Sequence, residues 1–213
     1  MTTNGQRSEL SDSTTLASFS ARVAKGASAL VGMRMIVRVL GFISMLILAR
    51  LLTPEDYGII ALATLLHGLL IAMSDFGFGL AIIRDSEAKD VDYHTAWTLR
   101  VLRSAVVALI VIVSAVPFAD FYEDSRLQSV MYCYAAMAMV MGLENIGTVN
   151  FIKEMRYRDD FNYFFISKLV SFIVGITAAF ILRNYWALVI GSFCLSLSRL
   201  GLSYYLDSFR PRF

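Results

Sequence analysis

Apolar residues in this chain gather into six long segments separated by short polar stretches. A helix needs about 20 residues to cross the hydrocarbon core of a bilayer. Each segment reaches that length only when charged residues inside it or beside it are counted, which predicts charged side chains at membrane depth. The pattern predicts an all-α polytopic membrane protein with six transmembrane helices, at residues 25–52, 54–83, 98–119, 127–151, 161–182 and 185–206.

The first two segments meet at a short hinge, residues 51–58, with the sequence Leu-Leu-Thr-Pro-Glu-Asp-Tyr-Gly. Thr53 can cap the second helix, Pro54 suits its first position, and Asp56 is placed to complete a capping box. A connection this short makes the two helices antiparallel neighbours. Because backbone polar groups in lipid must be satisfied internally, a helical bundle is the expected architecture.

The composition agrees with a membrane protein. Hydrophobic residues make up 57% and charged residues 17% of 213 residues, against about 45–50% and about 25% in soluble domains. The net charge of +2 and the lack of a basic, aromatic-rich cluster outside the apolar segments argue against a nucleic-acid partner. Cys133 and Cys194 both lie in apolar segments without metal or disulfide spacing, which predicts buried thiols.

Basic residues are distributed unevenly between the two ends of the predicted helices. With the N-terminus inside, only Arg50, Arg126 and Arg183 lie on the outer face. The inner face holds Arg7, Arg22, Lys25, Arg84, Lys89, Arg100, Arg103, Lys153, Arg156, Arg158, Lys168, Arg210 and Arg212. The positive-inside rule therefore predicts that both termini are cytoplasmic.

The sequence divides into three parts. Residues 1–20 are rich in Ser and Thr and lack the pattern of a cleavable signal peptide, so we expect a disordered cytoplasmic tail. Residues 21–207 form the predicted transmembrane lobe, and residues 208–213 begin a cytoplasmic link.

Charged residues inside the predicted spans share one half of the bilayer. At about 1.5 Å per residue, Arg38 lies about 21 Å from the hinge and Arg34 about 27 Å. These two arginines are four residues apart, on one helix face. Counting through the hinge also brings Asp75 within reach of Arg34. The full set in the inner half is Arg34, Arg38, Asp75, Glu144, Lys168 and Arg199.

Charges in such apolar surroundings are costly and usually functional. We interpret them as the cationic wall of a cavity that opens to the cytoplasm and receives an anionic group, since paired guanidinium groups bind phosphate oxygens well. The predicted substrate-binding residues are Arg34, Arg38 and Arg199. The alternative is that long basic side chains extend to the cytoplasmic interface, which we favour for Lys168.

Three further residues are candidates for ion coupling or, equally, for ion pairing or structural roles: Asp75, Glu144 and His67. His67 has no metal-ligating partner at helical spacing, and the chain carries no zinc spacing, P-loop or nucleophile elbow. Asp75-Phe76-Gly77 matches a kinase tripeptide, but the other kinase motifs are missing. The expectation is a protein that is not an enzyme and uses no cofactor or metal.

The stretch Leu48-Ala-Arg-Leu-Leu-Thr-Pro-Glu-Asp-Tyr-Gly58, continuing at residues 74–80 with Ser-Asp-Phe-Gly-Phe-Gly-Leu, resembles the polysaccharide flippases. These are the lipopolysaccharide and exopolysaccharide translocases of the multidrug/oligosaccharidyl-lipid/polysaccharide exporter superfamily. Residues 117–122, 151–158 and 209–212 also resemble that family, in the expected order. The resemblance implies a flippase that moves an undecaprenyl-diphosphate-linked sugar chain across the bacterial plasma membrane, through a cavity between two six-helix lobes.

The chain departs from that family in length, because family members usually have about twelve to fourteen spans. We therefore expect the N-terminal lobe only, with the bilayer, the lipid-linked sugar and either a second six-span lobe or another copy of itself as partners. Two alternatives stay open. One is a cation-coupled multidrug exporter of the same superfamily, which would need an acidic cavity. The other is a membrane subunit of a polysaccharide assembly complex without transport activity.

Overall fold

The computed structural model describes residues 32, 34–74, 77, 83 and 89–212, and the regular elements among these residues are all helices, with no β-strand. The prediction of an all-α protein is confirmed. The predicted tail, Asp75 and most of the final part of the second predicted span lie outside the described residues.

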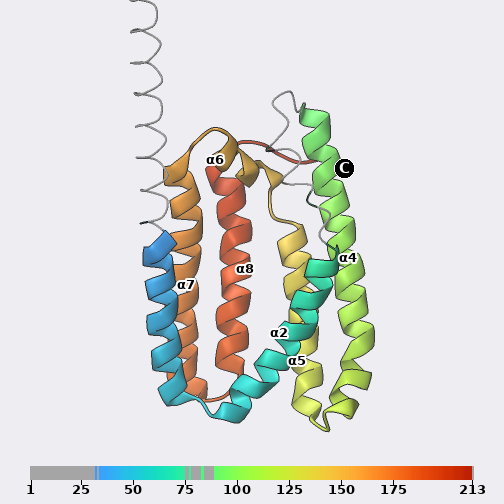
Figure 1. Cartoon of the computed structure of the whole chain (residues 1–213), viewed down its shortest axis with the longest axis vertical. Coiled ribbons are helices and arrows are strands. Elements are labelled where there is room, and N and C mark those ends of the chain that lie inside the picture. The colour runs from blue at the N-terminus through green and yellow to red at the C-terminus, as the bar shows by residue number, and fades with distance from the viewer. Residues whose placement is uncertain (1–31, 33, 75–76, 78–82, 84–88, 213) are drawn as a thin grey trace, which may run out of the picture.

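The helices lie side by side in an elongated bundle (Figure 1). A first helix covers residues 34–51. It is followed by α2 (Pro54–Ser74), α4 (Asp90–Phe121), α5 (Ser125–Gly142), η1 (Ile146–Val149), α6 (Asn150–Lys153), α7 (Tyr157–Leu182) and α8 (Trp186–Leu206).

Four of the described helices are long and apolar enough to cross a membrane: α2, α4, α7 and α8. A fifth span results if α5 and the η1–α6 segment count together, although the chain bends by 70° between them. The protein is therefore a multi-pass membrane protein, and the total of six spans stays a prediction.

The bundle consists of two groups of three helices. The hairpins α4–α5 and α7–α8 have the most extensive helix contacts. The first helix packs on α7 and α8 through Leu48, Leu52, Ala179 and Ala187, whereas α2 crosses the bundle obliquely to pack on α4 and α5 (Figure 1). We call the end where α2, α5 and α8 begin the hinge end, and the opposite end, where α4 and α7 begin, the strap end.

The hinge forms the capping box that its sequence predicts. Asp56 Oδ2 accepts hydrogen bonds from Thr53 N at 3.1 Å and Thr53 Oγ1 at 3.0 Å, while Asp56 N donates to Thr53 Oγ1 at 3.3 Å. Asp56 also accepts a hydrogen bond from the backbone N–H of Tyr185, at 2.9 Å to Oδ1. This buried carboxylate therefore joins the two helix groups at the hinge end.

At the same end, Asp124 caps α5 by accepting a hydrogen bond from Arg126 N at 3.0 Å. The Arg126 guanidinium lies 2.8 Å from Asp124 Oδ2. Its hydrogen bond lowers the pKa of the Asp124 carboxyl, so the cap stays ionised.

The chain leaves α5 at Gly142, within the segment 127–151 that the apolar pattern assigns to one span. Asn145, which is fully buried, causes the change of direction: its side chain accepts a hydrogen bond from Gly147 N at 2.9 Å and so caps η1. Asn145 also donates from its backbone to Ser203 Oγ at 3.0 Å and from its side chain to Phe209 O at 2.7 Å. The bend is thus fixed against the end of α8.

Residues 207–212, which we call the strap, run from α8 to the start of α4. Asp207 pairs with Arg156 at 3.4 Å, and the Phe209 ring packs 5.1 Å from that of His94. Arg212 N donates to His94 Nδ1 at 2.9 Å. These contacts use the first turns of α4, which begins at Asp90, before the predicted membrane segment 98–119.

Candidate functional site

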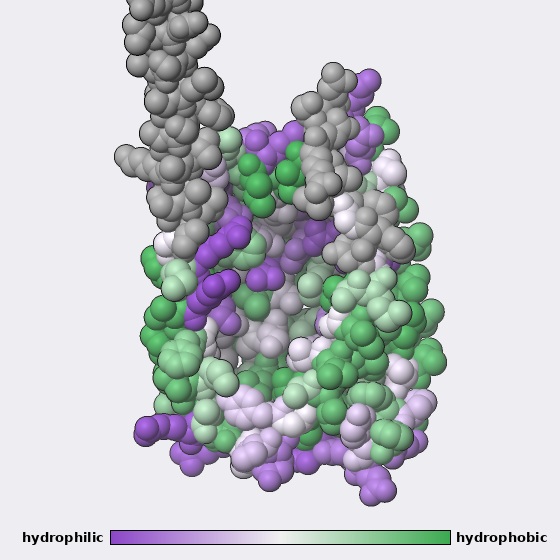
Figure 2. Space-filling model, in the orientation of Figure 1, coloured by the Kyte–Doolittle hydropathy of each residue, from purple (hydrophilic) through white to green (hydrophobic). Residues whose placement is uncertain are grey.

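A hollow opens in the face of the bundle between the first helix and the group formed by α2 and α4 (Figure 2). Hydrophilic residues gather in its part nearer the strap end, and less polar residues line the rest.

Beside the first helix lies α7, in which Asp160, Phe164 and Lys168 follow each other at four-residue intervals. The Lys168 side chain lies against Gly41 of the first helix, with Cε 3.5 Å from where a β-carbon would stand. The first helix and α7 run in the same direction (Figure 1). Residues one or two turns before Gly41 therefore lie level with residues one or two turns before Lys168.

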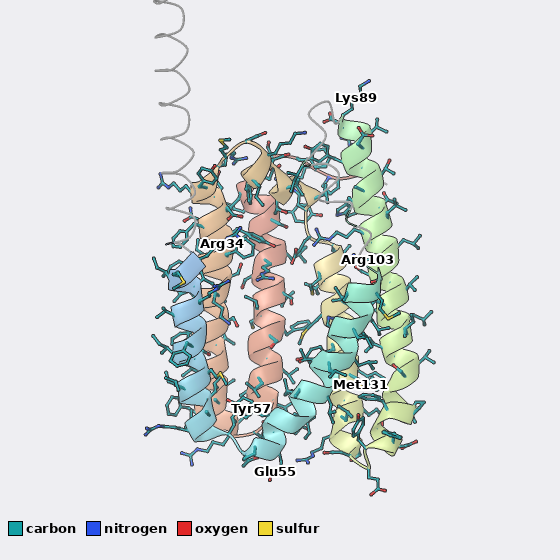
Figure 3. All side chains as sticks on the ribbon, viewed as in Figure 1. Arg34, Glu55, Tyr57, Lys89, Arg103 and Met131 are labelled. Carbon is teal, nitrogen blue, oxygen red and sulfur yellow. The ribbon has the colours of Figure 1, made fainter. Side chains whose placement is uncertain are left out.

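That register places Arg34 at about the level of Asp160. Arg34 lies near the strap end of the first helix, beside α7 (Figure 3). Asp160 is buried, at 5% exposed, and no ion pair or hydrogen bond joins it to Arg34 in the described part of the chain. Arg38 lies on the same helix face and is exposed, and no described residue forms a hydrogen bond or ion pair with it.

Arg199 reaches the same level from α8. Its guanidinium stacks over the Phe164 ring at 5.4 Å, and its buried Nε has no hydrogen-bond partner among the described residues. It is also near enough to Lys168 to interact with it electrostatically. The three predicted substrate-binding arginines and Lys168 thus come from three helices, the first helix, α7 and α8.

Glu144 is ion-paired, the second of the two roles expected from the sequence. Arg100 Nη2 donates to Glu144 Oε2 at 2.8 Å and to Met141 O at 2.7 Å, and Tyr163 donates to the same Oε2 at 3.1 Å. The cluster joins α4, the bend after α5 and α7. Because Arg100 neutralises Glu144, this carboxylate does not offset the positive charge of Arg34, Arg38, Lys168 and Arg199.

His67 lies in the core between α2 and α5. Its ring meets the edge of the Tyr134 ring at 5.4 Å, and the Tyr134 hydroxyl shares a hydrogen bond of 2.8 Å with Thr64. The buried Nδ1 has no partner within the described ranges. Those ranges also hold no group of three or more His, Cys, Asp or Glu residues that could bind a metal.

A separate groove between α2 and α4 has a volume of about 500 Å³ and is lined mainly by apolar side chains. Its polar rim includes Arg103, which donates to Ser74 O at 3.5 Å. This groove faces another side of α2 and lacks the clustered cations of the hollow.

Sequence reasoning missed Asp160 and Phe164 as members of the site. The eight-residue separation of Asp160 and Lys168 puts them on one face of a helix and could have indicated the acid. The stacking of Arg199 on Phe164 depends on how α7 and α8 pack, which no local pattern encodes. The candidate site therefore combines the four cations Arg34, Arg38, Lys168 and Arg199 with the acid Asp160 on the same stretch of α7 as Lys168.

These features define a polytopic helical membrane protein with a cationic hollow at membrane depth. The family described as "Polysaccharide biosynthesis protein" matches residues 47–213, and the chain belongs to this family. The match includes Asp160, Lys168 and Arg199 but begins after Arg34 and Arg38.

A relative supports the same identification. The chain is 24% identical over 177 residues to the succinoglycan biosynthesis transport protein ExoT of Rhizobium meliloti (strain 1021), an alignment covering 82% of this chain and 35% of the relative. The chain thus spans about a third of the length of that protein. No solved structure matches the chain. The resemblance to polysaccharide export proteins found in the sequence is confirmed.

Proposed function

We propose that this chain is the N-terminal lobe of a polysaccharide export flippase in the bacterial plasma membrane. Its substrate would be an oligosaccharide linked through a diphosphate to a polyprenyl lipid. The observation that carries the proposal is the set of cations toward the strap end of the first helix, α7 and α8: Arg34 and Arg38 on one helix, Lys168 against Gly41, and Arg199 stacked on Phe164. The family and the named transport function of the relative support a role in polysaccharide export.

The geometry suits a diphosphate for an electrostatic reason. An anion that leaves water for the membrane interior loses hydration, and fixed cations nearby offset that loss. Arg34 and Arg38 lie one helical turn apart, so their guanidinium groups can each grip one phosphate with paired N–H donors. Lys168 and Arg199 would hold the opposite side, while the sugar extends along the less polar part of the hollow.

The excess of cations argues against the multidrug exporter alternative. A carrier of cationic drugs needs anionic groups facing its cavity, and among the described residues the buried acid Glu144 is already paired with Arg100, while the candidate site holds four cations and the single acid Asp160. We propose that the strap end faces the cytoplasm, where the lipid-linked sugar would enter. Movement to the other leaflet would require a second six-span lobe or another copy of this chain.

The test replaces both first-helix arginines in the intact protein that contains this lobe. Arg34→Ala with Arg38→Ala should abolish surface polysaccharide while the amount of protein in the membrane stays normal, because the diphosphate loses its two strongest donors. Surface polysaccharide and membrane protein are measured in the same cells.

Arg50→Ala is the matched control, since Arg50 is an exposed arginine on the same helix but lies at the hinge end. It should leave export unchanged. Normal export in the Arg34/Arg38 double variant would overturn the proposal. Loss of drug efflux in that variant, with export intact, would favour the multidrug exporter.

A further inference from the structure

Arg199 is an arginine at membrane depth whose guanidinium contacts an aromatic ring rather than an acid. It lies about 20 Å along α8 from the helix start at Trp186, and its guanidinium stacks over the Phe164 ring at 5.4 Å. We propose that Phe164 is a positioning residue, which holds the Arg199 guanidinium in place while its N–H donors bind the diphosphate of the lipid-linked substrate. This inference rests on the proposed function and adds a residue to its binding site.

The hydrogen-bond donors of Arg199 are the first observation behind the proposal. A guanidinium group has five N–H donors, and the described residues accept a hydrogen bond from none of those on Arg199. One of these donors, Nε, is buried within the fold. A buried donor without a protein acceptor is rare in folded proteins and points to a ligand or an ordered water as its partner.

Two other arginines toward the strap end are paired with acids. Arg100 Nη2 donates to Glu144 Oε2 at 2.8 Å, and Arg156 pairs with Asp159 at 2.7 Å. These two arginines are neutralised by their carboxylates and act as structural ion pairs. No described acid forms an ion pair with Arg199, so its charge stays available, and such a charge at membrane depth is costly unless it has a function.

The Phe164 ring suits this role because it attracts a cation without accepting the hydrogen bonds that a phosphate would take. An arginine stacked on a ring uses its flat face, and its N–H groups lie in the guanidinium plane, so they can still bind another group. The ring itself meets the Tyr163 ring edge to face at 5.0 Å, and the Tyr163 hydroxyl donates to Glu144 Oε2 at 3.1 Å. The cluster around Glu144 therefore holds the ring that holds Arg199.

Phe164 also brings Arg199 toward a second cation. Phe164 and Lys168 are four residues apart and are neighbours on one face of α7, and the Lys168 side chain lies against Gly41 of the first helix. Neighbouring like charges repel each other, and an anion that binds both removes that cost. A diphosphate fits this requirement better than a single phosphate, because it offers two charged groups with several acceptor oxygens.

The experiment measures binding to the intact protein that contains this lobe, in nanodiscs of zwitterionic phosphatidylcholine. The probes are farnesyl diphosphate and farnesol, and empty nanodiscs correct for partitioning of each probe into lipid. Phe164→Met keeps a long apolar side chain but removes the ring face. It should weaken farnesyl diphosphate binding by about tenfold, as expected for a cation–π contact away from water, and should leave farnesol binding unchanged.

Further variants separate positioning from packing. Phe164→Tyr keeps a ring and should retain wild-type affinity. Phe165→Met is the matched control, because Phe165 is the next residue of α7 but stacks on Phe161 at 5.0 Å, and it should also bind as the wild type does. Arg199→Gln should weaken diphosphate binding, and in that background Phe164→Met should have no further effect, since the ring then has no cation to position.

The possible failures can be told apart. If the wild type binds farnesyl diphosphate no better than farnesol, the proposed function fails and this inference fails with it. If the wild type binds the diphosphate but Phe164→Met binds it equally well, or Phe164→Tyr loses it, only the inference is overturned. A loss in Phe164→Met that persists in the Arg199→Gln background also overturns it, because the ring then acts through some group other than Arg199.

Discussion

Asp56 is a single side chain that connects distant parts of the molecule. Its two carboxylate oxygens serve different partners, Thr53 in its own hinge and the backbone N–H of Tyr185 at the start of α8. The first partner follows from the local sequence, because a capping box depends on residues three apart. The second could not be predicted, because it depends on how the first helix and α2 pack on the α7–α8 turn.

Removing this carboxylate should destabilise the bundle. Asp56→Ala loses the capping box and leaves the buried N–H of Tyr185 without a partner, so we expect a loss of about 2 kcal/mol. Thermal unfolding in detergent can be followed with a thiol-reactive dye, since Cys133 and Cys194 are both free and half-buried.

Glu55→Ala is the control for this variant. Glu55 is exposed and lies in the same first turn of α2, so its removal should change the unfolding temperature little. Equal effects of the two substitutions would show that the hydrogen bonds of Asp56 do not stabilise the bundle.

Among single residues, Glu144 illustrates how much can be predicted by counting residues from a helix end to estimate depth in the membrane. The count predicted a carboxylate at membrane depth and left ion coupling and ion pairing open. Its partner Arg100 comes from α4, a helix that begins earlier than its apolar segment. Arg100 lies inside the predicted segment 98–119, but hydropathy does not show how α4 packs against the bend after α5, so the pairing could not be predicted.

At the scale of helices, α7 and α8 approach each other backbone to backbone. A β-carbon on Gly191 would lie 3.2 Å from Gly175 Cα and 3.6 Å from Ser171 O. Ser171 Oγ also donates to Gly191 O at 2.8 Å. Small residues in membrane helices allow such backbone contact and are a common basis of helix association.

A large side chain at this crossing should separate the two helices. Gly191→Leu is expected to cost about 1–3 kcal/mol of stability through overpacking, and it should weaken the stacking of Arg199 on Phe164 further along α8. The same thermal unfolding assay measures this loss of stability. Gly201→Leu is the control on the same helix, because a β-carbon there meets nothing within 4 Å. A Gly191→Leu protein as stable as the wild type would contradict the packing described.

The helices themselves were largely predictable, and the break after α5 was not. Long apolar segments specify helices because lipid leaves the backbone no alternative partners. The bend at residues 143–145 interrupts an apolar stretch without a proline. It is set by Asn145, whose partners Ser203 and Phe209 come from α8 and the strap. An apolar pattern carries no information about such distant partners.

At the scale of the whole molecule, the two groups of helices enclose the hollow, and its cations come from the first helix, α7 and α8. Counting depth from helix ends predicted that Arg34, Arg38, Lys168 and Arg199 share one membrane half, because helical rise is constant. It could not predict which of them face each other. That depends on the rotation of each helix about its axis, which packing decides.

The orientation in the membrane can be tested directly. In a variant with Cys133 and Cys194 replaced by Ser, Glu123→Cys lies at the hinge end and Ser208→Cys in the strap, both at exposed positions. A membrane-impermeant maleimide should label position 123 in intact spheroplasts and position 208 only after lysis, because basic residues concentrate at the strap end. The reverse pattern would mean that the hollow opens to the other side.

The capping box at the hinge also has a consequence for biosynthesis. The hairpins α4–α5 and α7–α8 join chain neighbours, and such local contacts form early because little loop entropy is lost. The bond between Asp56 and Tyr185 spans 129 residues and must wait until the start of α8 has been synthesised. Until then Thr53 supplies hydrogen bonds to the carboxylate, so a charge at the edge of the membrane is never without a partner while the chain is still growing.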